Sequence, residues 1–339
     1  MACQGRKTCL IWRMTIAVDV KNLRKTFKIR KKAGFWKTLL SPEYTDVEAV
    51  KGLSFTLQRG ERVAFVGPNG AGKSTTIKML SGILHPSAGE VSINGFTPWI
   101  DRTKMAYQIG TVFGQRSQLW YHLPARDTFE LLSYAYEMER DDFKKRMVTL
   151  VDAFDAGALI EKPVRQLSLG ERMRCEIIAS LLHKPSILFL DEPTVGLDVV
   201  SKGVIRDLVK QASEQDGTTV LLTSHDTGDM ERVCDRVIVI DHGQLVTDQR
   251  VKDLRTGYIH EKVITFAMTE VEIDMALDGA RLVEKMPHHL KISVDTSIVS
   301  VEHILQLAMS KTSLEDITVE DPPTEDIIKA IYSGVQSSR

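Results

Sequence analysis

The sequence predicts an α/β protein with a largely parallel sheet, followed by a smaller α+β module. Three observations predict this class. From Ile16 to about Gln249, short apolar runs of strand length alternate with longer helical patterns, which is typical of an α/β domain. After about Asp253 the runs become shorter and weaker. The chain has 339 residues, a length that allows about two domains.

Four apolar runs are candidates for the centre of the parallel sheet. Their near-continuous apolar character suits strands that are covered on both faces. These runs are Arg62–Val66, Ser186–Leu190, Thr219–Thr223 and Arg236–Ile240. Between the first two runs, the patterns at Asp127–Met138 and Lys144–Asp155 predict helices.

The two ends of the chain are expected to lie outside this α/β domain. Residues 1–15 are interpreted as an N-terminal tail, because their apolar stretch is too short for a secretory signal. Residues 253–339 are interpreted as an accessory α+β domain, which contains no recognisable catalytic cluster. Its expected strands are Val263–Ala267, Arg281–Val283 and Leu290–Val294, and its expected helices are Val299–Met309 and Glu325–Tyr332.

The composition is that of an ordinary soluble globular protein. The chain has 44 Lys and Arg against 45 Asp and Glu, and 43% of its residues are apolar. This balance disfavours wholesale disorder and a uniformly basic nucleic-acid binder. Apolar runs such as Ile187 to Leu190 are far shorter than the roughly 20 residues of a membrane-spanning helix. The four cysteines show no CxxC spacing, which indicates a reducing compartment without disulfides or a zinc site.

Charge is distributed unevenly along the chain. Residues 1–50 hold 11 basic and 4 acidic side chains, whereas residues 258–339 hold 7 and 14. Much of the basic excess lies in Lys28–Val47, which also contains Phe35 and Trp36. Two interpretations of this stretch stay open, a surface loop or a segment attracted to anionic lipid or to a membrane partner.

A phosphate-binding motif follows the first expected strand and opens a helix at Lys73. It runs Gly67, Pro68, Asn69, Gly70, Ala71, Gly72, Lys73, Ser74, Thr75 and matches G-x-x-x-x-G-K-[ST]. The glycines let backbone N–H groups converge on phosphate oxygens, and the following helix directs its N-terminus at the same anion. Lys73 adds a mobile cation, and the Ser74 hydroxyl is a hard oxygen ligand that suits Mg²⁺.

A second pair of candidate residues, Asp191 and Glu192, ends the apolar strand expected at Ser186–Leu190. Acidic side chains at the carboxyl end of a buried strand can hold a metal and a water beside phosphates in an open α/β sheet. We expect Asp191 to hold Mg²⁺ and Glu192 to polarise the attacking water. Together with the phosphate loop, these residues predict a nucleoside triphosphatase.

A five-residue segment before a helical run indicates the kind of nucleoside triphosphatase. It consists of Leu167, Ser168, Leu169, Gly170 and Glu171. With this segment the chain resembles the ATP-binding cassette (ABC) family of transport ATPases, whose signature is written LSGGQ. The resemblance implies that Ser168 and the N–H groups around Gly170 contact the γ-phosphate that the opposite subunit binds. Leu169 and Glu171 depart from the signature and add bulk and negative charge there.

Further matches to the family follow from the same resemblance. Gln115 matches the glutamine that reaches the metal and the attacking water, with Gln118 as a second choice. Asp198 in Gly196-Leu197-Asp198 matches the D-loop, and His225 matches the switch histidine that contacts the γ-phosphate. Phe27 occupies the place of the aromatic residue that stacks on adenine.

The resemblance implies that the protein is an ATPase that drives transport and uses the cofactors ATP and Mg²⁺. The expected domain comprises residues 16–252, with a helical subdomain at about 116–165. The expected partners are separate membrane-spanning permease subunits and a second cassette, as a homodimer or a paired subunit, with no nucleic acid. The chain is similar to bacterial export-type cassettes with a C-terminal extension, which implies a cytoplasmic position on the inner face of the membrane. Trp120, Tyr121 and Leu123 are candidates for contact with the permease or for ordinary packing.

Two other classes of function stay open at this point. One is an ABC ATPase that acts on ribosomes or DNA, although such proteins usually carry two cassettes or long coiled-coil arms, and this chain has one phosphate loop and no sustained heptads. The other is a small-molecule kinase with the same phosphate loop. A kinase gives no account of Ser168, Gly170 and His225.

Overall fold

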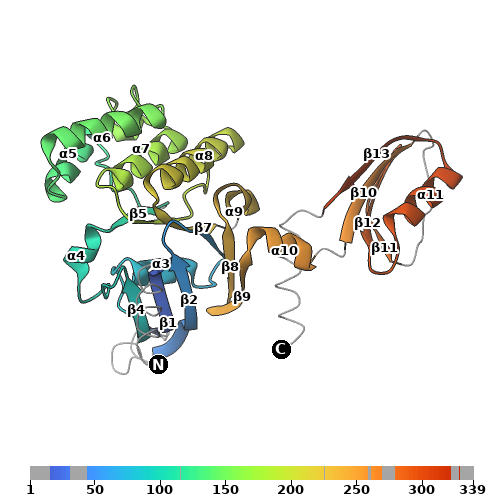
Figure 1. Ribbon diagram of the computed structural model, residues 1–339, viewed down its shortest axis with the longest axis horizontal. Coiled ribbons are helices and arrows are strands. Elements are labelled where there is room, and N and C mark those ends of the chain that lie inside the picture. The colour runs from blue at the N-terminus through green and yellow to red at the C-terminus, as the bar shows by residue number, and fades with distance from the viewer. Residues whose placement is uncertain are drawn as a thin grey trace, which may run out of the picture. The chain divides into compact units, whose positions relative to one another are not determined.

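The computed structural model describes residues 16–30, 44–114, 116–224, 226–258, 261–268, 279–321 and 328. Contacts divide the chain into two compact units, Met1–Val251 and Lys252–Arg339. Figure 1 shows the elements of both units.

The first unit is built around a six-stranded sheet in the order β5-β6-β7-β3-β8-β9. The strands are β3 (Arg62–Val66), β5 (Ile109–Phe113), β6 (Ile187–Asp191), β7 (Thr219–Ser224), β8 (Arg236–Asp241) and β9 (Gln244–Arg250). Neighbours pair in parallel except β8 and β9, which are antiparallel. The α/β class and the four central strands predicted from their apolar runs are therefore confirmed.

Strands β6 and β7 are buried almost throughout, as their apolar sequences require. In the sheet order, β3 departs from the order of the chain, because it lies between β7 and β8 and pairs with both. Parallel pairing brings the carboxyl ends of β3, β5, β6 and β7 to one edge of the sheet. Ligands of open α/β sheets bind beyond such an edge.

A second, antiparallel sheet in the order β2-β1-β4 contains β1 (Ile16–Arg30), β2 (Tyr44–Gln58) and β4 (Ala88–Ile93). Pairing of β1 with β2 continues from Ile16 opposite Gln58 to Arg30 opposite Tyr44. Both ends of the basic stretch Lys28–Val47 are therefore strand rather than loop, and residues 31–43 between them lie outside the described part.

Helices cover the sheets and extend the first unit at one end (Figure 1). They are α3 (Lys73–Leu80), α4 (Arg102–Ala106), α5 (Ala125–Ala135), α6 (Arg140–Ala153), the 3₁₀ turn η1 (Val164–Gln166), α7 (Leu169–Leu181), α8 (Val199–Asp216) and α9 (Thr227–Val233). The main core joins both sheets and α3, with Phe65 and Phe189 fully buried in it. Cys175 and Cys234 are buried free thiols.

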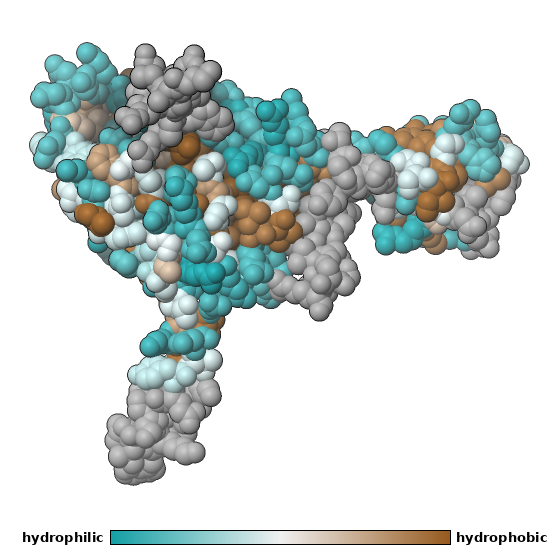
Figure 2. All heavy atoms as spheres, turned by 60° about the horizontal axis from the view of Figure 1, so that its bottom comes forward, coloured by the Kyte–Doolittle hydropathy of each residue, from teal (hydrophilic) through white to brown (hydrophobic). Residues whose placement is uncertain are grey.

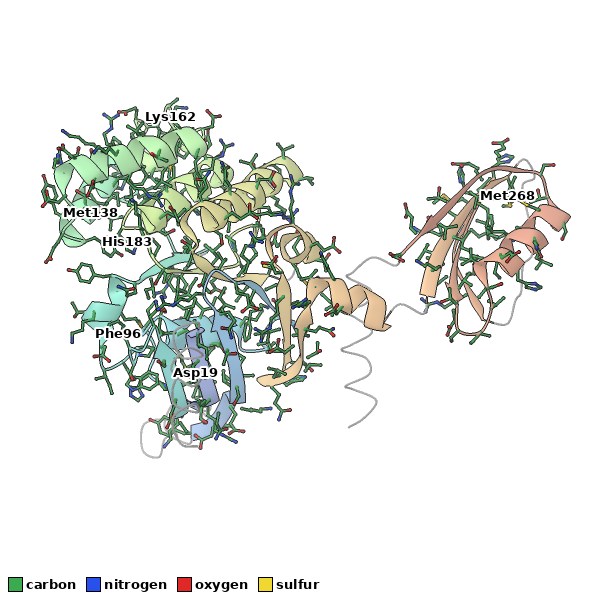
Figure 3. All side chains as sticks on the ribbon, in the orientation of Figure 1. Asp19, Phe96, Met138, Lys162, His183 and Met268 are labelled. Carbon is green, nitrogen blue, oxygen red and sulfur yellow. The ribbon has the colours of Figure 1, made fainter. Side chains whose placement is uncertain are left out.

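Helix α6 is fastened to its neighbours by the side chain of Arg146. Its guanidinium donates to Leu181 O over 3.1 Å and to Asp216 Oδ2 over 2.5 Å. Nearby, the ring of Tyr136 stacks on the ring of His183, which is labelled in Figure 3, with centroids 3.8 Å apart. Burial lowers the pKa of His183 to about 4, so the ring packs in its neutral form.

The second unit has an antiparallel sheet in the order β11-β12-β10-β13. Its elements are α10 (Val251–Tyr258), β10 (Glu261–Met268), β11 (Ala280–Met286), β12 (His289–Asp295), α11 (Val301–Lys311) and β13 (Leu314–Glu320). Ile264, Phe266 and Met268 of β10 are buried with Ile304 of α11 in a separate core (Figure 3). The helix predicted at Glu325–Tyr332 lies outside the described residues, apart from Ile328.

Candidate nucleotide-binding site

The phosphate-loop sequence joins the end of β3 to the start of α3. Residues Pro68 to Thr75 line a hollow of about 610 Å³, together with Ala49, Glu192 and Val195. Helix α3 begins at Lys73, so its unpaired N–H groups face the loop. This combination of glycine-rich loop and helix N-terminus is suited to binding a phosphate chain.

Gly72 is required by the close approach of this loop to β2. It caps α3 with a φ of 101°, which is in the left-handed region that favours glycine. A Cβ atom at this position would lie 2.6 Å from the carbonyl oxygen of Ala49. Ala49 was missed by sequence reasoning, because only the folded sheet brings β2 against a loop more than 20 residues later.

Lys73 is 5% exposed at the base of the hollow. Its Nζ donates to Gly67 O over 2.7 Å and to Pro68 O over 3.3 Å, and it lies 3.6 Å from Glu192 Oε1. Burial lowers the pKa of Lys73, while the neighbouring carboxylate Glu192 opposes that shift. The ammonium is thus held by backbone carbonyl groups of the same loop that is suited to phosphate.

Ser74 and Asp191, predicted from separate motifs, are brought into contact. Ser74 Oγ donates to Asp191 Oδ1 over 2.9 Å, and Thr223 Oγ1 donates to the same oxygen over 2.7 Å. A hydroxyl and a carboxylate oxygen are hard donors that suit Mg²⁺, which completes its coordination with water and phosphate oxygens. No cluster of three His, Cys, Asp or Glu that could hold a metal occurs in the described residues. The oxygens of Ser74 and Asp191 fit a magnesium ion that takes its remaining ligands from phosphate and water.

Glu192 faces both the phosphate-loop hollow and a second hollow of about 140 Å³. Its backbone has a φ of 54°, an uncommon conformation for a residue with a side chain. The conformation is held by bonds from Glu192 N to Thr223 Oγ1 over 3.0 Å and to Thr223 O over 3.1 Å. Thr223 thus orients both acidic residues, a role that no local motif indicated.

Two predicted residues, Gln115 and His225, lie outside the described part of the chain. Their neighbours can be located. Gly114 and Arg116 line the second hollow with Asp191 and Glu192, and Gly114 N donates to Asp191 O over 2.9 Å. Gln118 is the second candidate for the glutamine that reaches the metal and the attacking water. Its Nε2 instead donates to Glu176 O of helix α7 over 3.0 Å.

Phe27 lies on β1 opposite Val47 of β2. Lys25 Nζ is 5.3 Å from the centroid of its ring. Phe27 is not among the residues that line the two hollows. Val47 is two residues along β2 from Ala49, which does line the phosphate-loop hollow. Contact of Phe27 with a nucleotide base stays a prediction.

The signature segment forms the start of helix α7. Ser168 is its N-cap, with Ser168 Oγ accepting from Glu171 N over 3.3 Å and Ser168 N donating to Glu171 Oε2 over 2.8 Å. This capping box explains a glutamate at the third helical position. The bond from Ser168 N lowers the pKa of Glu171. Because Ser168 Oγ accepts in the box, its own hydrogen stays available for another acceptor.

The signature segment and the D-loop lie against each other within this chain. A Cβ atom on Gly170 would lie 2.7 Å from Ser201 Oγ, and one on Gly196 would lie 3.1 Å from Leu169 Cδ2. Asp198 caps α8 by accepting from Ser201 N over 2.9 Å. In the described residues, however, neither Asp198 nor any of the five signature residues lines a hollow of the phosphate loop.

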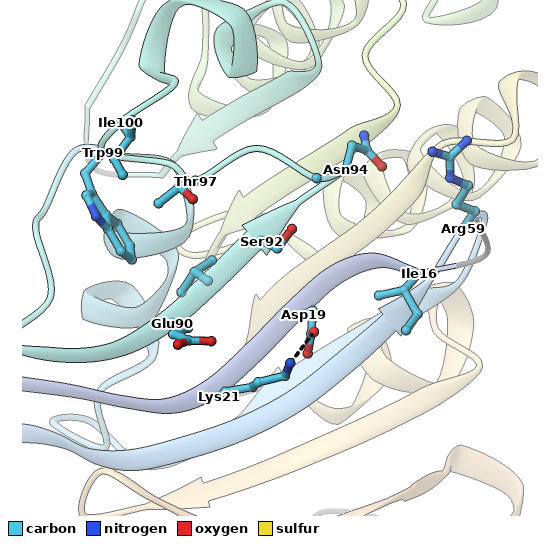
Figure 4. Close-up of a pocket in the computed structure, with 12 residues that line it drawn as sticks. Ile16, Asp19, Lys21, Arg59, Glu90, Ser92, Asn94, Thr97, Trp99 and Ile100 are labelled. Atoms are coloured by element: carbon cyan, nitrogen blue, oxygen red, sulfur yellow. Dashed lines mark ion pairs between the residues drawn. The ribbon is translucent and has the colours of Figure 1, made fainter. Parts of the chain in front are cut away.

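A larger hollow, of about 820 Å³, lies elsewhere on β1 and β4 (Figure 4). Lys21 and Asp19 form an ion pair of 3.3 Å in its wall, and Glu90, Asn94 and Trp99 lie around them. None of the predicted site residues lines it. Because it contains none of the residues of the phosphate loop or of the acidic end of β6, its size does not make it the reactive site.

The phosphate loop, the acidic end of β6 and the parallel sheet define the class of this protein as a P-loop nucleoside triphosphatase. Comparisons with known proteins then define the family. Residues 50–195 match the family model described as ABC transporter.

Three relatives illustrate the similarity. The chain is 30% identical over 273 residues to the linearmycin resistance ATP-binding protein LnrL of Bacillus subtilis, covering 80% of this chain and 87% of LnrL. It is 34% identical to the daunorubicin resistance ATP-binding protein DrrA3 of Streptomyces coeruleorubidus, covering 62% and 66%. A dimeric post-hydrolysis structure of the ATP-binding cassette MJ0796 with ADP and Pi has a TM-score of 0.59 and 27% identity, covering 69% and 98%.

The chain belongs to the ATP-binding proteins of the ABC transporter family. It is an ATP-binding, ATP-hydrolysing subunit of an ABC transporter. This assignment favours transport over the kinase and over action on ribosomes or DNA. Among the described residues, no helix has both the length and the apolar character that crossing a membrane requires.

Proposed function

We propose that this protein drives export through separate membrane-spanning subunits by closing and reopening an ATP-dependent dimer. One observation carries the proposal. The signature segment, to which we assign contact with the γ-phosphate, lines neither hollow of the phosphate loop in the described residues. A second cassette would supply the missing half of each site, as homodimer or paired subunit.

The proposed roles follow from the contacts of each side chain. Lys73 binds the β- and γ-phosphates from the base of the hollow, and Ser74 and Asp191 hold Mg²⁺. Bound Mg²⁺ supplies positive charge that offsets the charge of the phosphates. Glu192 faces the hollow and accepts a proton from the attacking water. Gln115 and His225 contact the metal, water and γ-phosphate, and Phe27 stacks on adenine.

Closure and reopening follow from which groups bind the γ-phosphate. With ATP bound, Lys73 of one copy and Ser168 of the other bind the same phosphate, which favours the closed dimer. Hydrolysis separates that phosphate from the nucleotide, so the shared contact is lost and the dimer reopens. Exposed Val195, Val199 and Val200 beside the D-loop would be covered on closure.

The direction of transport is inferred from relatives whose names refer to resistance, LnrL and DrrA3. Removal of a toxic molecule from the cell requires export. Trp120, Tyr121 and Leu123 are exposed beside the start of α5, and we assign them to contact with the membrane-spanning subunits. The protein would then lie on the cytoplasmic face of the membrane, with residues 253–339 as an accessory domain.

Mixing two inactive variants tests the shared site. Lys73→Ala disables the phosphate loop, and Ser168→Arg blocks the signature. In a mixed dimer, one site combines an intact loop with an intact signature, so an equal mixture should regain about a quarter of wild-type ATPase activity if the sites act independently. Phosphate release from MgATP measures this recovery. A mixture that stays as inactive as each variant alone would contradict a site shared between copies.

A further inference from the structure

Asp229 is the centre of a buried polar cluster that the proposed chemistry does not use. The residue is fully buried at the start of helix α9. Its Oδ2 accepts from Thr194 Oγ1 and from Ser224 Oγ, each over 2.5 Å, and its Oδ1 accepts from Arg206 Nε over 2.6 Å. A buried carboxylate is costly unless such donors satisfy it.

The three donors come from three different segments of the site. Thr194 lies two residues after Glu192, in the loop that follows β6. Ser224 ends β7 and immediately precedes His225. Arg206 lies on α8, the helix that Asp198 of the D-loop caps. One carboxylate therefore fastens together the segments that carry the proposed base, the proposed switch histidine and the D-loop.

The backbone on both sides of His225 is fixed by the same cluster. Asp226 N donates to Ser224 Oγ over 2.9 Å, so the residues before and after position 225 are bonded to each other. Asp226 in turn accepts from Lys202 Nζ over 2.7 Å and from Arg206 over 3.0 Å. Because Ser224 Oγ also donates to Asp229, Ser224 cannot shift without breaking a buried, charge-assisted bond.

We propose that Asp229 is a positioning residue for ATP hydrolysis, which fixes the loop of Glu192 relative to Ser224 and Asp226, the residues on either side of position 225. This inference rests on the catalytic roles proposed above for those two residues. Asp229 itself lines neither of the two hollows at the phosphate loop. Small displacements of catalytic groups cause large losses of rate, so loosening the cluster should lower kcat while leaving the binding of ATP by the phosphate loop intact.

Thr194→Val tests the role most cleanly, because it removes one hydroxyl of nearly equal volume and leaves the charge of Asp229 paired with Arg206. We expect kcat to fall about tenfold and KM for ATP to change less than about twofold. Thr194→Ser restores the hydroxyl and should recover kcat. Asp229→Asn places an amide against Arg206 and should lower kcat about a hundredfold.

The matched control is Asp216→Asn. It disrupts the ion pair between Asp216 of α8 and the buried Arg146 of α6, which lies away from the phosphate loop. This variant should lower the thermal unfolding temperature and leave kcat unchanged. The positioning role is overturned if Thr194→Val keeps the wild-type kcat, or if Asp216→Asn loses as much. Glu192→Gln is assayed alongside. If Glu192→Gln hydrolyses ATP normally, the proposed function and this inference are both rejected. If Glu192→Gln loses hydrolysis but Thr194→Val keeps full kcat, only the positioning role of Asp229 is rejected.

Discussion

The phosphate loop and the signature edge, defined as Leu167–Glu171 with Asp198–Val200, differ sharply in exposure. Lys73 at the base of the loop is 5% exposed, and backbone carbonyl groups of its own chain surround it. At the signature edge, Val199 is 84% exposed and Val200 is 76% exposed. Figure 2 shows that the face of the first unit it presents has apolar patches between hydrophilic areas.

This difference teaches which half of the site one chain can complete. The phosphate loop needs only local bonds and the neighbouring strands, because β3, β6 and α3 already meet there. The signature edge satisfies its backbone through the capping box of Ser168 and Glu171 but leaves apolar side chains in water. Adjacent exposed valines beside these capped helix N-termini support the proposed dimer, in which another cassette would cover this surface.

Glu192→Gln should produce the largest change, at the loop side of the comparison. The amide cannot accept the proton of the attacking water, so we expect hydrolysis to fall about a thousandfold while ATP still binds. The uncleaved γ-phosphate should then hold two copies together. Phosphate release measures the first effect, and sedimentation with ATP measures the second. A monomer with normal turnover would contradict the role of Glu192.

Lys73→Ala should reduce the affinity for ATP by about a hundredfold, because phosphate charge would then be only partly compensated. Titration of a fluorescent ATP analogue measures the affinity. Lys104→Ala, on the exposed surface of α4, removes the same charge away from the loop and is the control. Equal affinities for both variants would show that the loop binds without its lysine.

A double change at the signature edge, Val199→Asp with Val200→Asp, should weaken ATP-dependent dimerisation about tenfold or more. The new carboxylates would have to lose water on closure, whereas the phosphate loop of each monomer should bind ATP as before. Sedimentation in the Glu192→Gln background measures the dimer. Val148→Asp, at an exposed position on α6, is the control. Undiminished dimerisation would remove the valines from the interface.

The fold was predictable where burial leaves a continuous apolar pattern. Strands β3, β6, β7 and β8 have this pattern, and their predicted and observed ends agree within about one residue. The paired arms of β1 and β2 were not predictable, because Lys28, Arg30 and Asp46 give them the composition of a surface loop. Backbone pairing holds these arms, and backbone bonds leave no signature in side-chain hydropathy.

The site was predictable where neighbours in sequence are neighbours in space. The phosphate loop and the acidic end of β6 satisfy this condition, so Lys73, Ser74, Asp191 and Glu192 could be located together. Thr223 could not, because it reaches Asp191 only through the pairing of β6 with β7. Asp229 was missed for the same reason, since its three donors converge from distant segments only after folding.

Glu171→Gln should have the smallest effect, and it probes how the signature edge is held without a partner. In the folded chain the bond from Ser168 N lowers the pKa of Glu171, so the folded state favours the carboxylate. That contribution is fully present above the unfolded pKa, near 4.5, and is lost as pH falls through the lower folded value. Gln keeps an acceptor without the charge, so we expect wild type to be more stable by about 0.5 kcal/mol at pH 7, a value reduced by solvent screening.

Urea unfolding at pH 7 and below pH 4 should show that this difference in stability between wild type and Glu171→Gln closes as pH falls. The control is Glu139→Gln, at the start of α6, where the side chain makes no cap hydrogen bond. This variant should show no such change. A gap that persists at low pH would mean that the capping box depends on shape rather than charge.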